Sequence, residues 1–175
     1  MPLRSSAIGA VRHSLPEFFD GKPVPVRYRR NLRDIAGNPA HAATSISQRF
    51  ILLDPSLKRQ AKEHRRILLH EYFHFAWVRL GNQRRRAWEM HLANEWRSGG
   101  RGEAGWSAEW RKQKLTAEDV IHRTKRWRDY CCESFCDTAA WITGGIDSEV
   151  TLARTRRRAR ISWFRKHFGD YLFPI

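Results

Sequence analysis

The spacing of apolar residues divides the chain into a short N-terminal part with strand-like segments and a longer helical part. Segments with the length and apolar spacing of helices are 55–80, 84–97, 117–143 and 148–168. The first of these is apolar on almost every side around residues 67–80, which predicts a helix buried in the core. Its start at Asp54-Pro55 is typical of a helix N-terminus, and the run from Thr116 to Asp119 resembles a capping box at the start of the third helix.

The N-terminal part predicts a small β-sheet. Residues 23–28 combine prolines, which exclude helix, with valine and tyrosine, and residues 44–53 form a second strand candidate. Residues 34–39 between them have the composition of a turn, and the glycine-rich residues 98–106 predict a flexible loop. We therefore expect one α+β domain over residues 1–175 that is mostly helical, with a small N-terminal sheet.

The chain is strongly basic. Lysine and arginine outnumber aspartate and glutamate by 33 to 18, which gives a formal net charge of +15. Such a surface attracts nucleic acid, anionic membranes or acidic proteins, but charge alone does not identify the partner. The predicted basic C-terminal helix, 148–168, carries much of this charge on Arg154, Arg156, Arg157, Arg158, Arg160, Arg165 and Lys166. Along one helix face such residues can follow a phosphate backbone, so binding of nucleic acid is a second function to test.

The sequence indicates neither a membrane span nor a signal peptide. No stretch approaches the about 18 uncharged apolar residues of a transmembrane helix, and the N-terminus has no apolar signal core. Cys131, Cys132 and Cys136 are odd in number and close together, which does not resemble a disulfide framework. We therefore expect reduced, buried thiols and a cytoplasmic location. Cys132 and Cys136 could also hold a metal ion, but the chain has no C-x-x-C spacing.

Residues 70–74 read His-Glu-x-x-His, the most specific motif in the chain. On a helix, His70 and His74 lie one turn apart on the same face, so both imidazoles can reach one metal ion. Glu71 lies next to the first histidine and can take a proton from a water on that metal. Zinc lowers the pKa of such a water to about 7, so a carboxylate is a sufficient base. The motif predicts zinc-activated hydrolysis with Glu71 as the catalytic base.

This segment resembles the active-site helix of the zincin metallopeptidases. The resemblance implies a zincin-like fold around the 55–80 helix, zinc as the cofactor, and a peptide or protein substrate bound along an edge strand. The longer pattern of the metzincin branch is missing, because Trp77 and Leu80 stand where that pattern has glycine and histidine. A third ligand must therefore come from another part of the chain.

Glu133 and Asp137 are the preferred completion of the site. Their E-x-x-x-D spacing puts both carboxylates on one helical face. Glu133 could then bind the metal, while Asp137 accepts the ring N–H of a ligand histidine. The pair resembles the later helix of the glutamate-ligand zincins, and residues 138–141 are similar to a small-residue run in compact cytoplasmic zincin-like proteins.

Several alternatives stay open at this point. Glu95 lies in a run similar to that of the thermolysin branch, although Gly99 stands where that branch has aspartate. The third ligand could also be His91, His122 or a cysteine. Peptide hydrolysis further needs a donor for the developing oxyanion, and the candidates are His122, Tyr130 and Tyr72.

The function predicted from these residues is that of a zinc-dependent metallopeptidase. The alternative is a nucleic-acid-associated protein that uses the same fold for binding or regulation, with weak or no peptidase activity. A third interpretation is a zinc-dependent hydrolase of a non-peptide substrate.

Overall fold

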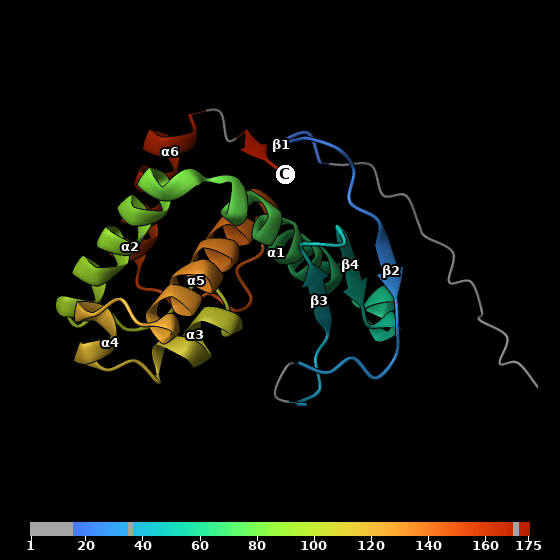
Figure 1. Ribbon diagram of the computed structural model, residues 1–175, viewed down its shortest axis with the longest axis horizontal. Coiled ribbons are helices and arrows are strands. Elements are labelled where there is room, and N and C mark those ends of the chain that lie inside the picture. The colour runs from blue at the N-terminus through green and yellow to red at the C-terminus, as the bar shows by residue number, and fades with distance from the viewer. Residues whose placement is uncertain (1–15, 35–36, 170–171) are drawn as a thin grey trace, which may run out of the picture.

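The computed structural model describes residues 16–34, 37–169 and 172–175, and these residues form a mostly helical α+β structure, as predicted. In chain order the elements are β1 (Phe19–Asp20), β2 (Val26–Tyr28), β3 (Ala42–Ser45), β4 (Phe50–Leu53), η1 (Pro55–Arg59), α1 (Ala61–Arg79), α2 (Gly81–Arg97), α3 (Trp106–Lys112), α4 (Ala117–Ile121), α5 (Lys125–Gly144), α6 (Arg154–Phe168) and β5 (Phe173–Pro174). Figure 1 shows α1 in the middle, between the three-stranded sheet on one side and α2, α3 and α5 on the other.

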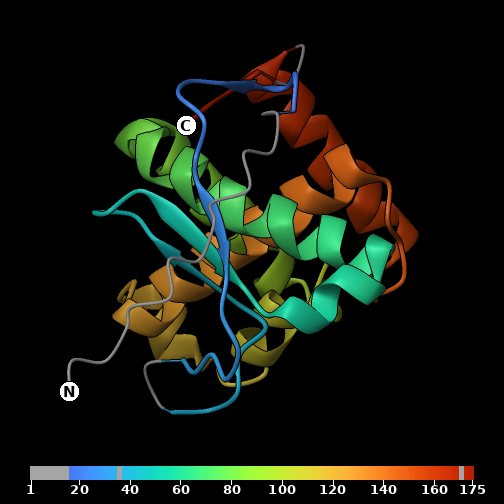
Figure 2. The same ribbon diagram turned by 90° about the vertical axis from the view of Figure 1, so that its right-hand side faces the viewer.

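The three-stranded sheet covers one side of α1. Its strand order is β2-β4-β3, with β2 parallel and β3 antiparallel to β4, and Val26 lies opposite Ile51. Along β4 the side chains of Ile51 and Leu53 are buried while those of Phe50 and Leu52 are only partly covered, the alternation of a strand with one face on the core. Figure 2 views the molecule from the sheet side and shows the strands lying over α1.

A second, smaller sheet joins segments from near both ends of the described chain. Strand β1 pairs in parallel with β5, and Phe19 lies opposite Phe173. The ring of Phe73 on α1 lies 4.9 Å from the rings of both residues, measured between centroids. The C-terminal strand therefore closes the apolar core over α1.

The helix predicted over 55–80 is divided near its start. Asp54 caps the 3-10 helix η1 by accepting a hydrogen bond from the backbone N–H of Ser56 at 2.8 Å. Gln60 then leaves the helical conformation, with φ of −127° and ψ of 72°, and α1 begins at Ala61. At the other end Gly81 has a φ of +71°, a conformation that glycine adopts readily, and α2 follows without a loop.

The helix predicted over 117–143 is divided as well. Helix α4 starts with the expected capping box, in which Thr116 and Asp119 exchange hydrogen bonds between side chain and backbone. Arg123 then adopts a left-handed φ of +48°, and Thr124 caps the new helix α5. The change of direction allows α5 to pack along α1.

Two predictions were wrong. Residues 44–53, expected to form one strand, form β3 and β4 as a hairpin with a turn at residues 46–49. The basic C-terminal helix expected over 148–168 begins only at Arg154, because the backbone N–H groups of Thr151 and Leu152 donate to the carbonyl of Glu103 at 3.0 and 3.1 Å. The loop expected over 98–106 does follow α2 and ends where α3 begins at Trp106, although the sequence did not predict α3.

Within the described residues, no helix is both long enough and apolar enough to cross a lipid bilayer.

Candidate metal centre

Helix α1 places the His-Glu-x-x-His residues together at its contact with α5. The Nε2 atoms of His70 and His74 lie 3.1 Å apart, as expected of side chains on successive turns. The donor atoms of these two histidines and a carboxylate oxygen of Glu71 all lie within 4.8 Å of one another. His70 and Glu71 are buried and His74 is partly exposed.

Helix α5 brings the predicted carboxylates to the same point. The Oε2 atom of Glu133 lies 3.2 Å from Nε2 of His70. One turn later, Oδ1 of Asp137 lies 2.7 Å from Nδ1 of the same ring, so the ring N–H donates to this carboxylate. The two carboxylates therefore contact opposite nitrogens of His70, with Glu133 on the side that faces His74 and Asp137 on the far side.

Helix α3 holds both carboxylates and was missed by the sequence analysis. Ser107 donates a hydrogen bond from Oγ to Glu133 at 2.7 Å, and Nη2 of Arg111 lies 3.2 Å from the other oxygen of Glu133. The backbone N–H of Ala108 donates to Asp137 at 2.8 Å. A Cβ at Gly105 would lie 2.5 Å from the Asp137 carboxyl carbon, so this close approach requires glycine. The glycine directly before residues 106–112 was the available signal.

The sheet contributes one contact to Glu71. Thr44, on strand β3, donates a hydrogen bond from Oγ1 to Oε2 of Glu71 at 2.5 Å. Because β3 pairs with β4 at the end of the strand order, its other edge is not covered by a described strand. An edge strand therefore lies beside the candidate catalytic base.

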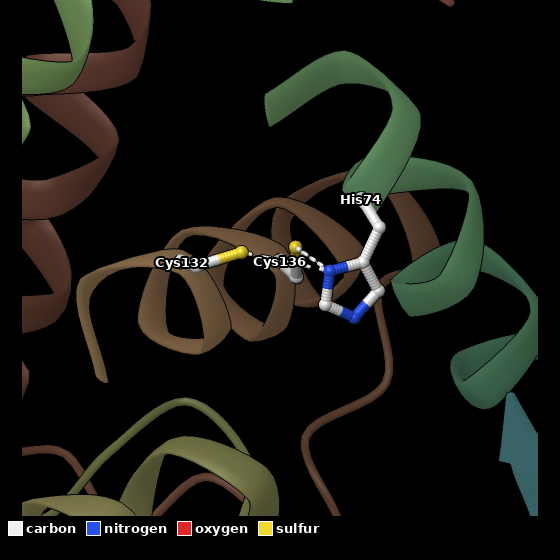
Figure 3. Close-up of side chains that lie close together, drawn as sticks. All are labelled: His74, Cys132 and Cys136. Carbon is white, nitrogen blue, oxygen red and sulfur yellow. Dashed lines mark hydrogen bonds between the residues drawn. The ribbon is translucent and has the colours of Figure 1, made fainter. Parts of the chain in front are cut away.

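The second nitrogen of His74 faces sulfur. Its Nδ1 atom lies 3.5 Å from Sγ of Cys132 and 3.6 Å from Sγ of Cys136. Figure 3 shows the imidazole of α1 and the two thiols of α5 pointing toward one another. All three cysteines are free thiols, as the sequence predicted, although Cys132 is only partly buried.

The charges around the histidines favour a cation. Burial lowers the pKa of His70, but the carboxylates of Asp137 and Glu133 outweigh burial and hold this pKa well above its ordinary value. Burial also lowers the pKa of His74, but the contacts with Cys132 and Glu133 outweigh burial and raise this pKa to about 9. Burial raises the pKa of Glu133, yet its contacts with His70, His74 and Arg111 lower that pKa overall.

The donor spacing fits zinc. Zinc bonds to nitrogen or carboxylate oxygen of about 2.0–2.1 Å and a tetrahedral angle place neighbouring donors about 3.3 Å apart. The observed separations are 3.1 Å between the two histidine nitrogens and 3.2 Å between His70 and Glu133. These two separations match the spacing of zinc ligands, while the group of donors that all lie within 4.8 Å of one another consists of His70, Glu71 and His74 and does not include Glu133.

Glu95, the rival third ligand, lies in another cluster. Its carboxylate contacts Arg160 at 2.7 Å and His91 at 3.1 Å, so this glutamate and His91 pair with each other and with the buried arginine. The structure therefore does not support either residue as the third zinc ligand. His122 is exposed and contacts Glu118, which removes it from the site as well.

The tyrosines proposed as oxyanion donors also have other partners. Tyr130 donates its hydroxyl hydrogen to buried Glu103 at 2.5 Å, and Tyr72 donates to the carbonyl of Val24 at 3.4 Å. Arg111, on α3, is the cation that the structure places beside Glu133.

The basic surface is smaller than the sequence suggested. Arg160 is completely buried, and Arg156 and Arg157 donate hydrogen bonds to backbone carbonyls. The exposed basic residues of α6 are Arg154, Arg158, Arg165 and Lys166. Binding of nucleic acid through this helix stays a prediction, carried by these four side chains.

Comparisons of the chain with family models, with curated proteins and with solved structures found no match. The resemblance to the zincins therefore depends on the motif residues alone.

Proposed function

We propose that this protein is a zinc-dependent metallopeptidase in which His70, His74 and Glu133 hold the ion. The observation that carries the proposal is that Nε2 of His70 lies 3.1 Å from Nε2 of His74 and 3.2 Å from the carboxylate of Glu133, which comes from a second helix. Incidental core histidines would not need a carboxylate on each ring nitrogen of His70.

Glu71 is the catalytic base in this proposal. When bound, zinc supplies a Lewis acid that makes water a nucleophile near neutral pH. Glu71 takes the proton of the attacking water and then delivers it to the leaving amine. The hydrogen bond from Thr44 holds the carboxylate of Glu71 in place for both transfers.

The remaining contacts orient the ligands. Asp137 accepts the Nδ1 hydrogen of His70, which leaves the Nε2 lone pair free to bind metal. Ser107 and Arg111 hold Glu133 in turn. The carboxylates are thus fixed from a third helix, α3.

The sheet suggests how a peptide would bind. Strand β3 has one edge that no described strand covers, and it carries Thr44 next to Glu71. An extended peptide can add to such an edge through main-chain hydrogen bonds, which selects for backbone more than for side chains. A peptide or protein substrate therefore suits this site better than a small non-peptide one.

The direct test is metal content followed by a peptidase assay. The purified chain is expected to hold about one zinc, and a chelator should abolish cleavage of a mixed peptide library. Glu133→Gln should lose zinc because the amide oxygen is a weaker ligand, whereas the exposed Glu118→Gln should not. Zinc below half an equivalent in the unmodified chain, even after zinc is added back, would refute the metal site. Bound zinc with no cleavage of any peptide would favour the non-peptide hydrolase or the nucleic-acid-associated protein.

Asp137→Asn is expected to lower zinc affinity by about 10–100-fold, because the neutral amide has only one acceptor oxygen for the two N–H groups of His70 and Ala108 that the carboxylate now binds. The matched control is Asp129→Asn, an exposed carboxylate on the same helix that pairs with Lys125. Competition with a chromophoric chelator measures both affinities. Equal affinities for the two variants would show that Asp137 does not orient the ligand.

A further inference from the structure

The two ring nitrogens of His74 face two different kinds of potential metal ligand. Its Nε2 faces His70, while its Nδ1 faces the thiols of Cys132 and Cys136 on successive turns of α5 (Figure 3). The Nδ1 atom and the two sulfur atoms lie within 4.8 Å of one another. The sequence favoured buried thiols without a ligand role, because the cysteine spacing alone did not show that a histidine completes the set.

The distances in this cluster match those of a metal site. Zinc–sulfur bonds of about 2.3 Å and zinc–nitrogen bonds of about 2.0 Å, at a tetrahedral angle, separate nitrogen from sulfur by about 3.5 Å. The observed separations from Nδ1 are 3.5 Å to Cys132 and 3.6 Å to Cys136. Both nitrogen–sulfur separations are therefore those expected for ligands of one ion.

The kind of ligand in this cluster also suits a metal, because it offers two sulfur atoms and one imidazole nitrogen. The thiolate is the form of cysteine that binds metals, and soft ions prefer it to nitrogen or oxygen ligands. Cys136 is fully buried, while Cys132 is partly exposed.

We propose that Nδ1 of His74 and the sulfur atoms of Cys132 and Cys136 form a second metal site for a thiophilic ion such as Zn²⁺, Cu⁺ or Cd²⁺. This site goes beyond the proposed peptidase function and does not depend on it. Binding releases to solvent the thiol protons of Cys132 and Cys136 and the Nδ1 proton of His74.

Sharing of His74 couples the second site to the first. An ion on Nδ1 replaces the hydrogen that fixes the ring for metal binding through Nε2. Occupation of the thiolate site is therefore expected to change the zinc affinity of the first centre, and an excess of a thiophilic ion would act on the peptidase through this residue.

The test is a titration of the full chain, preloaded with about one equivalent of zinc, with CdCl₂. About one Cd²⁺ per chain should produce the ultraviolet sulfur-to-cadmium charge-transfer band of thiolate ligands. Cys132→Ala and Cys136→Ala should each lose most of this band. Cys131→Ala is the matched control and should keep it, because the neighbouring Cys131 is a buried thiol outside the cluster.

His70→Ala separates this proposal from the proposed function. That variant should lose the first zinc but keep the cadmium–thiolate band, since His70 contributes nothing to the second site. Circular dichroism shows whether each variant is folded, and alkylation of Cys132 in folded protein gives a second measurement, because bound Cd²⁺ should protect this thiol. A folded chain that shows no thiolate band at stoichiometric Cd²⁺, or whose band survives both Cys132→Ala and Cys136→Ala, would overturn the second site.

Discussion

Glu71→Gln is expected to lower the turnover number for peptide cleavage by about 10²–10⁴-fold while zinc stays bound. Glutamine keeps the size of the side chain, and its amide oxygen can still accept the hydrogen bond from Thr44. The amide cannot take a proton from water, so the base is lost. Because His70, His74 and Glu133 are unchanged, the metal content of the variant should equal that of the unmodified chain.

The control for this experiment is Glu63→Gln. Glu63 lies on the same helix and pairs with Arg66. Steady-state kinetics and elemental analysis on both variants separate the base from a general effect of charge removal on α1. A Glu71→Gln variant with near-normal turnover would refute the assigned mechanism, and one without zinc would show that Glu71 is a ligand instead.

Arg160→Met is expected to destabilise the fold by about 3–5 kcal/mol. The guanidinium of Arg160 is completely buried on α6 and contacts Glu95 at 2.7 Å and Glu103 at 2.6 Å. Methionine fills similar space but leaves two buried carboxylates without their main cation. That loss is comparable to the total free energy of unfolding of many small domains, about 5–15 kcal/mol.

Urea unfolding measures the difference in the free energy of unfolding between Arg160→Met and the unmodified chain. Arg158→Met serves as the control, because this neighbouring arginine is exposed and should change the free energy of unfolding little. A difference between the two variants below about 1 kcal/mol would show that the buried cluster does not stabilise the fold. A variant that does not fold at all agrees with the prediction, provided that Arg158→Met folds.

The same cluster predicts a loss of stability in acid. Burial raises the pKa values of Glu95 and Glu103, but Arg160 and their other hydrogen-bond partners lower both to about 2, against 4.5 for an ordinary glutamate. Since the folded-state values lie below those of the unfolded chain, the contribution is complete above about pH 4.5 and is lost as the pH falls toward 2. In Arg160→Met this acid-sensitive contribution should be smaller, because only the contacts of Glu95 with His91 and of Glu103 with Lys112 and Tyr130 remain.

The local sequence determined the elements and the pairs of residues within them. His70 and His74, and likewise Glu133 and Asp137, share a helical face because the period of about 3.6 residues applies to any helix. The predominance of helix, the small sheet and the capping box at Thr116 follow from equally local patterns, and the structure agrees with them. Zinc binding itself stays a prediction.

Only the tertiary structure decided which helix faces lie against each other. The packing of α5 on α1 puts Glu133 beside His70, whereas Glu95 lies beside Arg160, although the sequence offered both glutamates as ligands. For the same reason Arg160 is buried in what looked like a basic surface, and the Nδ1 atom of His74 meets two thiols. These contacts join residues 58 or more positions apart, and such distant contacts depend on how whole helices pack and not on any local periodicity.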